Sequence, residues 1–337
     1  MMSGNTLHSG HNTSINSSNC TYNSTSRDEV MKQLYFYFYL LIFIPGLLGN
    51  SLALFVLCRF ISKKTKAIIF MINLAIADLL HVLSLPLRIY YYFTLSWPFG
   101  KDLCMFCFYL KYLNMYAGIA FLVCISIQRC TFLMRPFCAK KWKRRYDVRI
   151  SVTVWLAVGL CCSPFILMRS NSQATNSSCF KDLPTHKLSL RLAMPMIAFG
   201  ELLGFVIPLL IISFCSYSIG RSLSRNNPTQ QSPADKRKAL QMVRVCTGVF
   251  LFCFAPYHIN FLLYMLVSQD VIKHCPLQNV VLYFHPISLC IASLNCCLNP
   301  LIYYFLTTEF REQLVRHGSS VLRGRLMSME STSSYRE

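Results

Sequence analysis

The sequence predicts an all-α protein in which seven membrane-spanning helices pack as one bundle. Of its 337 residues, 54% are hydrophobic and only 14% are charged, whereas a soluble domain carries about 25% charged residues. The mean hydropathy of +0.42 shows that the apolar excess extends along the chain. These values argue against a soluble enzyme, a disordered protein and a nucleic-acid-binding protein, although the formal net charge is +20.

Seven apolar runs carry this prediction. They lie at residues 33–59, 67–93, 102–133, 149–169, 192–220, 240–267 and 278–305. Each run is long enough to cross about 30 Å of hydrocarbon as a helix, and none alternates polar and apolar residues as a barrel strand does. Prolines inside the runs predict kinks, because a helix bundle can offer other partners to the carbonyls that a proline frees.

The first residues of the chain are polar. Residues 1–32 are rich in Ser, Asn and Thr and are expected to form a disordered, glycosylated extracellular tail. Glycosylation sequons begin at Asn12, Asn16, Asn19, Asn23 and, in a later loop, Asn176. The transmembrane domain is expected to occupy residues 33–305.

Two further segments follow the seventh run. Residues 306–317 are expected to form a short amphipathic helix on the membrane surface, with Phe310 and Leu314 facing the bilayer. Residues 318–337 are expected to be a disordered cytoplasmic tail, whose phosphorylated serines and threonines would recruit arrestin.

The positions of Lys and Arg predict the orientation in the membrane. If the N-terminus is outside and the C-terminus inside, the three inner loops hold 18 of the 33 Lys and Arg residues and the three outer loops hold 6. This bias follows the positive-inside rule, so the high net charge is mainly an orientation signal. The densest basic patch, at residues 140–145, is expected to face anionic lipids of the inner leaflet.

Each predicted span also contains a short motif. The motifs are Gly49-Asn50, Leu74 to Asp78, Gln128-Arg129-Cys130, Trp155, Pro208, Phe250 with Cys253 to Pro256, and Asn299 to Tyr303. In this order they resemble the rhodopsin-like (class A) G-protein-coupled receptors over residues 33–317. The segments Trp97 to Gly100, Phe108 to Tyr116 and Phe254 to His258 resemble the purinoceptor-like branch of that family, and in particular its lysophosphatidylserine receptors.

The resemblance implies a mid-membrane switch and two disulfides. The polar cluster of Asp78, Asn114, Asn295 and Asn299 would hold an allosteric sodium ion, the only cofactor or metal that we expect, although Gly118 stands where many relatives have Ser. A hydrogen-bonded polar plug without an ion is the alternative. One implied disulfide joins Cys104 to Cys179, and the other joins Cys20 to Cys275.

Activation and G-protein coupling are also implied by the resemblance. The residues concerned are Arg129, Phe250, Phe254, Pro256, Pro300 and Tyr303. Gln128 replaces the acid that usually precedes the arginine. Without that carboxylate the resting state should be held less firmly, which predicts more ligand-free signalling than a Gln128→Glu variant shows.

Cations and aromatic residues near the outer end predict an anionic ligand. The candidate ligand-binding residues are Arg88, Tyr91, Tyr92, Lys111, Tyr112, Tyr116, Arg169, Tyr257 and His258. Snorkelling of an arginine to the lipid headgroups is the alternative for Arg88 or Arg169. Glu201 is a candidate partner for a ligand ammonium group, and a role in packing is the alternative.

Two absent cations favour a lipid over a nucleotide. Nucleotide receptors of the branch carry a cation where this chain has Phe261, and many carry another in the outer seventh helix, where this chain has His285 and Leu289. We therefore predict a multi-pass plasma-membrane receptor for an anionic lysophospholipid, and for lysophosphatidylserine in particular. It would signal through heterotrimeric G proteins, of the twelve/thirteen type by resemblance, when the sixth helix moves outward.

Three other functions are alternatives to this prediction. A nucleotide receptor of the same branch is the nearest. A transporter or channel is a remote one, because apolar turns separate Asp78 from Arg129 and leave no continuous polar path. An enzyme is disfavoured, because no Ser/His/Asp or metal-ligand set is present in the sequence.

Overall fold

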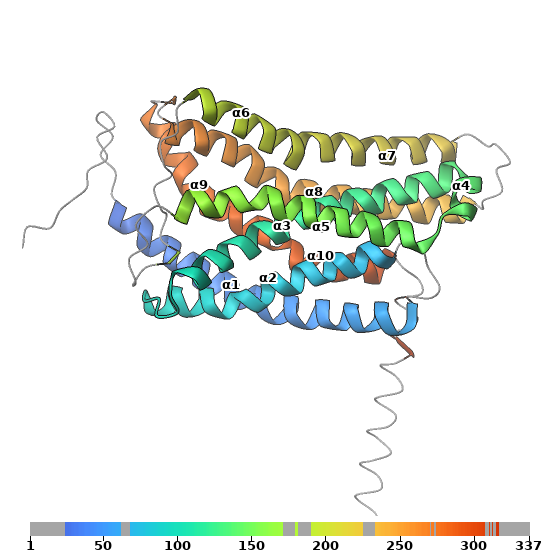
Figure 1. The fold of residues 1–337 in the computed structure, drawn as a ribbon, viewed down its shortest axis with the longest axis horizontal. Coiled ribbons are helices and arrows are strands. Elements are labelled where there is room, and N and C mark those ends of the chain that lie inside the picture. Colours follow the sequence, from blue (N-terminus) through green and yellow to red (C-terminus); the bar gives the residue numbers. More distant parts are fainter. Residues whose placement is uncertain are drawn as a thin grey trace, which may run out of the picture.

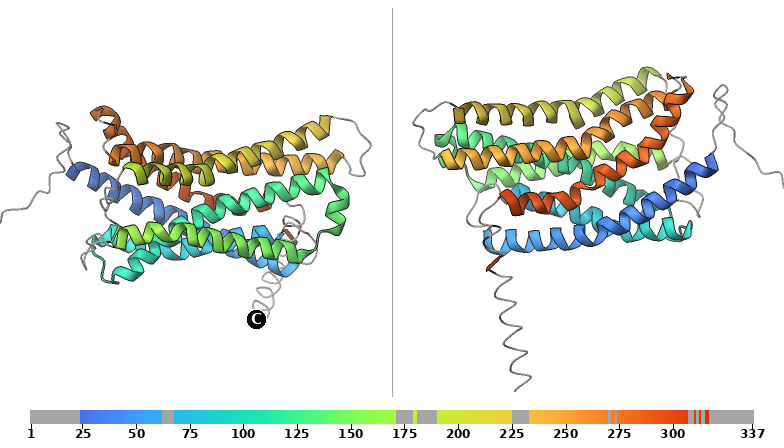
Figure 2. Two further views of the ribbon diagram at one scale, coloured as in Figure 1. Left: turned by 45° about the horizontal axis from the view of Figure 1, so that its top comes forward. Right: turned by 180° about the vertical axis from the view of Figure 1, so that it is seen from behind.

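The computed structural model describes residues 24–61, 68–170, 179–180, 190–224, 233–269, 271–272, 274–306, 310, 312 and 315–316. This part of the chain is almost entirely helical and contains no strand. Seven of its helical segments are long and apolar enough to cross a membrane, which confirms the predicted fold class. Figures 1 and 2 show that they run side by side as one elongated bundle.

The helices follow one another in the order that the apolar runs predict. Their bounds are α1 (Ser24–Val56), η1 (Leu57–Ile61), α2 (Ile68–Thr94), α3 (Lys101–Met134), α4 (Pro136–Lys141), α5 (Arg144–Ser170), α6 (Leu190–Glu201), η2 (Leu202–Val206), α7 (Ile207–Ser224), α8 (Pro233–Ser268), α9 (Cys275–Ser293) and α10 (Asn295–Leu306). The segments η1 and η2 are π-helical turns. The fifth span comprises α6, η2 and α7, and the seventh comprises α9 and α10. Below, the two ends of the bundle are called the disulfide end, which holds Cys104, and the Arg129 end.

Helix α1 begins earlier than expected. It starts at Ser24, whereas the sequence placed residues 1–32 in a disordered tail and began the first run at residue 33. The extra turns are polar, and an ion pair of 3.6 Å between Glu29 and Lys32 supports them, because residues three apart lie on one face of a helix. Residues 1–23, with their four sequons, and Asn176 lie outside the described residues.

The fifth span contains a wide turn that the sequence analysis did not predict. Pro208 has no amide hydrogen for the carbonyl of Gly204, and its ring crowds that carbonyl, which disfavours a regular α-helical turn there. The chain instead forms the π-helical turn η2. Gly204 allows a close approach at this turn, because a Cβ atom at this position would lie 2.8 Å from the Tyr116 ring and 2.9 Å from the His258 ring.

The seventh span is also broken. It divides at Leu294 into α9 and α10. The amide of Leu294 donates to the Ile291 carbonyl (3.1 Å) and the amide of Cys297 to the Leu294 carbonyl (3.0 Å), each three residues back along the chain.

The described residues after the seventh span correct one expectation. Phe310 is only 3% exposed and its ring lies 6.4 Å from that of Tyr303, so it packs against the bundle and does not face the bilayer. Leu314 lies outside the described residues.

Apolar side chains cover the outside of the bundle and polar ones occupy its centre. Leu41, Leu160 and Phe214 are each about 70% exposed, whereas Asp78 and Asn299 are fully buried. This distribution is the reverse of that in a soluble protein, and it fits a surface that contacts lipid. The buried polar groups therefore have to find partners within the protein.

The contact between α1 and α2 gives a testable consequence. A Cβ atom at Gly46 would lie 2.9 Å from Cγ2 of Val82, whereas one at Gly200 in α6 would meet nothing within 4 Å. Both changes to Ala gain helix propensity, but only Gly46→Ala overpacks the core, which costs about 1–3 kcal/mol. Thermal unfolding of the purified protein should show Gly46→Ala as less stable than Gly200→Ala. Equal unfolding temperatures would contradict this account of the α1–α2 contact.

Candidate functional site

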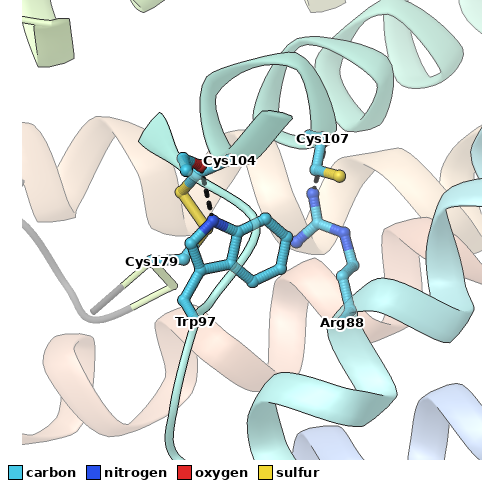
Figure 3. The surroundings of a disulfide bond; sticks show 6 residues. Arg88, Trp97, Cys104, Cys107 and Cys179 are labelled. Atoms are coloured by element: carbon cyan, nitrogen blue, oxygen red, sulfur yellow. Dashed lines mark hydrogen bonds between the residues drawn. A yellow bond between two sulfur atoms is a disulfide. The ribbon is translucent and has the colours of Figure 1, made fainter. Parts of the chain in front are cut away.

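A disulfide lies at the end of the bundle that holds the candidate site. Cys104, in the first turns of α3, is bonded to Cys179 with their Cα atoms 5.7 Å apart, as predicted. Figure 3 shows this bond beside Trp97, whose Nε1 donates a hydrogen bond of 2.6 Å to the Gly100 carbonyl. Because Phe180 directly follows Cys179, the disulfide also holds Phe180 against α3 and against the α2–α3 connection. Cys275 is also disulfide-bonded, but its predicted partner Cys20 lies outside the described residues.

Arg88 is buried among aromatic rings instead of facing open space. Its side chain is 1% exposed, and its Nη2 donates a hydrogen bond of 2.6 Å to the Cys107 carbonyl (Figure 3). Its guanidinium carbon lies 4.5 Å from the centre of the Phe180 ring and 5.6 Å from that of Phe108. Such cation–π contacts hold a desolvated arginine in place. The snorkelling alternative for Arg88 therefore does not apply in this structure.

Lys111 lies close to the same aromatic cluster. Its Nζ donates to the Tyr39 hydroxyl at 3.5 Å and lies 5.7 Å from the centre of the Tyr35 ring. Arg88 also faces Tyr39, at 5.9 Å from the ring centre. Two cations from α2 and α3 thus converge on one tyrosine of α1. The sequence analysis missed both Tyr35 and Tyr39, although their spacing of four residues places them on one face of a helix.

The tyrosines of α2 complete this first cluster. Tyr92 stacks on Tyr35 with ring centres 4.9 Å apart, and Tyr91 meets Phe180 edge-on at 5.3 Å. Both are buried. The structure therefore brings together four of the predicted ligand-binding residues, Arg88, Tyr91, Tyr92 and Lys111, from two helices and packs them against α1.

A second cluster lies between α3, the fifth span and α8. His258 is buried, and its Nδ1 lies 3.2 Å from a carboxylate oxygen of Glu201. Its ring meets Tyr116 edge-on at 6.1 Å, Tyr257 edge-on at 5.2 Å, and Phe205 face-to-face at 5.3 Å. Glu201 and Phe205 are brought to His258 by the η2 turn, which begins directly after Glu201.

Two predicted residues remain. Tyr112 is partly buried and follows Lys111 on α3, beside the core that surrounds the second cluster. The Arg169 backbone belongs to α5, but its side chain lies outside the described residues. The third predicted cation therefore cannot be placed beside the other two.

The positions that argued against a nucleotide are filled by aromatic and apolar side chains. Phe261 stacks on Tyr257 with ring centres 5.5 Å apart. His285 stacks on Tyr264 at 4.1 Å, and its Nδ1 lies 3.1 Å from the Asn260 amide nitrogen. Neither position carries a Lys or Arg, so no additional permanent cation lies on this side of the described site.

A polar cluster lies at the middle of the bundle. The two carboxylate oxygens of Asp78 accept hydrogen bonds of 2.8 Å from the side-chain amides of Asn114 and Asn299, so the predicted residues of α2, α3 and α10 do meet. Asn50 does not reach Asp78 and instead donates to the Cys296 carbonyl at 2.6 Å. Asn295 packs against Gly118, where a Cβ atom would lie 3.0 Å from its amide nitrogen.

The Arg129 end contains a carboxylate that the sequence analysis missed. Asp147, in the first turn of α5, is fully buried. Its Oδ1 accepts hydrogen bonds of 2.8 Å from Gln128 Nε2 and 2.7 Å from Trp142 Nε1. A carboxylate from α5 thus lies beside Gln128, although the motif around Gln128 contains no acid of its own. Trp142 is anchored by this contact within a basic patch that is otherwise exposed.

Candidate activation residues line the core towards the same end. Phe250 and Phe254 are fully buried and meet edge-on at 5.9 Å, and Phe250 stacks on Phe205 at 5.7 Å. Tyr303 is fully buried and donates a hydrogen bond of 3.2 Å to the Met71 carbonyl.

The remaining activation residues are helix breakers and one cation. Pro256 lies inside α8 and Pro300 inside α10, where Pro300 packs close to Gly49 of α1. Arg129 is half-buried near the end of α3. These positions agree with the motif order, while the roles of the residues stay a prediction.

Comparison with known proteins decides the family. The sequence profile of the seven-transmembrane receptors of the rhodopsin family matches residues 49–303. The chain belongs to the rhodopsin family of receptors. This receptor is therefore not an enzyme, and it is a multi-pass protein of the plasma membrane with a ligand and a G protein as partners.

Individual relatives place the receptor within the family. It is 56% identical to purinoceptor 10 of Homo sapiens over 93% of this chain and 95% of that protein. It is 50% identical to human G-protein coupled receptor 174 (88% and 90%) and 36% identical to human lysophosphatidic acid receptor 6 (92% and 90%). The receptor thus falls in the purinoceptor-like branch that includes lysophospholipid receptors.

The Asp147 contact changes what a Gln128→Glu variant should do in this receptor. The change places a second carboxylate within hydrogen-bond distance of Asp147, and two buried carboxylates repel each other. We expect a loss of about 1–3 kcal/mol of stability, the usual cost of unsatisfied buried polar groups, and ligand-free signalling that rises instead of falling.

The double variant Gln128→Glu/Asp147→Asn is the matched control. It restores one carboxylate and one amide, so its unfolding temperature and its ligand-free signalling should return towards those of the unchanged receptor. If both variants behaved alike in a thermal-shift and a G-protein dissociation assay, the Gln128–Asp147 contact would not matter for the resting state.

Proposed function

We propose that this receptor responds to an anionic lysophospholipid, and to lysophosphatidylserine in particular. The observation that carries the proposal is the convergence of Arg88 and Lys111 on Tyr39 at the disulfide end. A phosphate group suits such a site, because charge-assisted hydrogen bonds to Lys and Arg are stronger than neutral ones. The name of one relative, lysophosphatidic acid receptor 6, supports the same ligand class, whereas the name of purinoceptor 10 fits the nucleotide alternative.

The two cations are assigned different tasks. Arg88 is buried and already donates to the Cys107 carbonyl, so it contributes positive charge and fixes α2 to α3. Lys111 is only partly buried, and its ammonium group is carried by a flexible stem. Lys111 is therefore the proposed contact of the phosphate.

The second cluster supplies an acid for the head group. Glu201 is 14% exposed on its side chain while His258 is 1% exposed, so the carboxylate is the more accessible member of the pair. A serine head group carries an ammonium group as well as negative charges. We assign Glu201 to that ammonium group, with Tyr116 and Tyr257 around it.

Signalling is proposed to follow the family pattern. With the N-terminus outside, as the distribution of Lys and Arg predicts, the disulfide end faces the exterior and the Arg129 end faces the cytoplasm. Ligand binding would favour the state in which α8 bends outward about Pro256, and a G protein of the twelve/thirteen type would bind the cleft that opens. Arrestin would bind after phosphorylation of the tail.

A dose–response experiment tests the ligand class. Cells that express the receptor should show G-protein dissociation with lysophosphatidylserine and none with ADP or UDP. The reverse result would establish the alternative, a nucleotide receptor of the same branch. Lysophosphatidic acid serves as the comparison that lacks the ammonium group, and Glu201→Gln should narrow the difference between the two lipids.

The Lys111→Gln variant tests the site. Loss of one charge-assisted hydrogen bond should raise the half-maximal agonist concentration by about ten- to hundredfold. Arg191→Gln is the matched control, because Arg191 is exposed on α6 at the same end and should leave the response unchanged. An unaltered response of Lys111→Gln at equal surface expression would remove Lys111 from the ligand site.

The mid-bundle cluster is proposed to hold a sodium ion. Besides the carboxylate of Asp78, the amide oxygens Asn295 Oδ1 and Asn299 Oδ1 are buried and make no hydrogen bond within the described chain. Oxygen atoms of carboxylates and amides are the ligands that hard cations prefer. When bound, the ion would supply positive charge beside Asp78, and these residues would hold it in the resting state.

Agonist binding in the presence and absence of salt tests this assignment. Sodium chloride should lower agonist affinity more than the same concentration of N-methylglucamine chloride, which sets the effect of ionic strength aside. Asp78→Asn removes the negative charge and should abolish the difference between the two salts. If the difference persisted in Asp78→Asn, the polar plug without an ion would be the better description.

A further inference from the structure

The α7–α8 surface at the Arg129 end carries a hollow that the receptor function above does not use. It has a volume of about 750 Å³ and is lined from α7 by Tyr217, Gly220 and Arg221 and from α8 by Arg244 and Gly248. A second hollow of about 620 Å³ shares Arg244 and Gly248 and continues along α8 to Arg237. The two hollows, which meet at Arg244 and Gly248, are together called here the α7–α8 groove.

Two glycines line this groove. A Cβ atom at Gly220 or at Gly248 would meet nothing within 4 Å, so neither glycine is required for close packing of the two helices. Glycine inside a helix costs stability relative to alanine. Their common effect is to leave space on the surface between α7 and α8, at the level of Arg221 and Arg244.

The charges of the groove are not compensated within the described chain. Arg221, Arg237 and Arg244 are exposed, and none of the three makes a hydrogen bond or an ion pair in the part of the chain that the structure describes. The helix α7 contains no Asp or Glu, and the only acid of α8 is Asp235. Arg237 and Arg244 are seven residues apart, which places them two turns apart on one face of α8.

The surroundings of the groove are apolar. It lies within the two segments Met194–Ser224 and Lys236–Ser268, which are long and hydrophobic enough to span the membrane. Tyr217 is 64% exposed beside the groove, and Phe252 is 57% exposed one turn beyond Gly248. A surface with guanidinium groups at one end and aromatic and apolar side chains along its length matches a phospholipid, with a charged head and acyl chains.

We propose that the α7–α8 groove binds one anionic phospholipid of the membrane leaflet at the Arg129 end, with its phosphate between Arg221 and Arg244. A guanidinium group can donate two parallel hydrogen bonds to a phosphate, and Gly220 and Gly248 make room for the head group. The acyl chains lie over the exposed side chains of Tyr217 and Phe252. This site is separate from the proposed agonist site at the disulfide end, so each can fail without the other.

Native mass spectrometry of the full-length receptor tests the proposal. The purified receptor is mixed in detergent with phosphatidylglycerol or, for comparison, with phosphatidylcholine, and bound lipids are counted. We expect one phosphatidylglycerol retained in preference to phosphatidylcholine. Arg221→Gln/Arg244→Gln should weaken this binding about thirtyfold, the effect of two basic residues at a membrane surface. An excess of inorganic phosphate should not displace the lipid, because a free ion makes no use of the apolar part of the groove.

Two further variants separate this site from non-specific attraction. Arg149→Gln/Lys238→Gln removes the same charge from exposed positions of α5 and α8 that do not line the groove, and it should retain the lipid. Gly248→Leu fills the groove without changing its charge and should lose the lipid. Equal losses in the two charge variants, or full binding by Gly248→Leu, would show that the arginines merely reach towards any head group and would overturn the proposal.

Discussion

The carboxylate of Asp78 is the polar centre on which the bundle depends. It is fully buried and joins α2 to α3 through Asn114 and to α10 through Asn299. The hydrocarbon around such a bundle offers no hydrogen bonds, so a charge at this depth has to be satisfied by other helices. The arrangement of three helices is thus coupled to one side chain, and the break between α9 and α10 lies beside it.

The same requirement explains the contacts of two other buried charged residues. Arg88 is enclosed by the rings of Phe108 and Phe180 and gives one hydrogen bond to a backbone carbonyl. Asp147 accepts hydrogen bonds from Gln128 and Trp142. Each charge is held by partners from a different helix or loop, so each also fixes how those elements are placed.

Much of the fold could be predicted because its signals are local. The hydropathy predicted the seven spans, and the order of the motifs indicated the polar cluster around Asp78. The partner of Gln128 was not predictable, because Asp147 is separated from it by the whole connection that includes α4, and only packing brings the two together. The contacts of Tyr39 with Arg88 and Lys111 were not predictable from the pattern of charged residues, because tyrosine carries no charge. The amphipathic helical pattern predicted that Phe310 faces lipid, but its ring instead contacts Tyr303 of the bundle.

The wide turn η2 has a consequence for how the cluster around His258 could vary among related receptors. A π-helical turn holds about one residue more than an α-helical turn, and each residue advances a helix by about 100°. A single insertion or deletion within Leu202–Val206 would therefore rotate all of α6, Glu201 included, while α7 kept its orientation. A change of one residue can in this way exchange all the side chains that α6 presents towards α3 and α8 and leave those of α7 where they are.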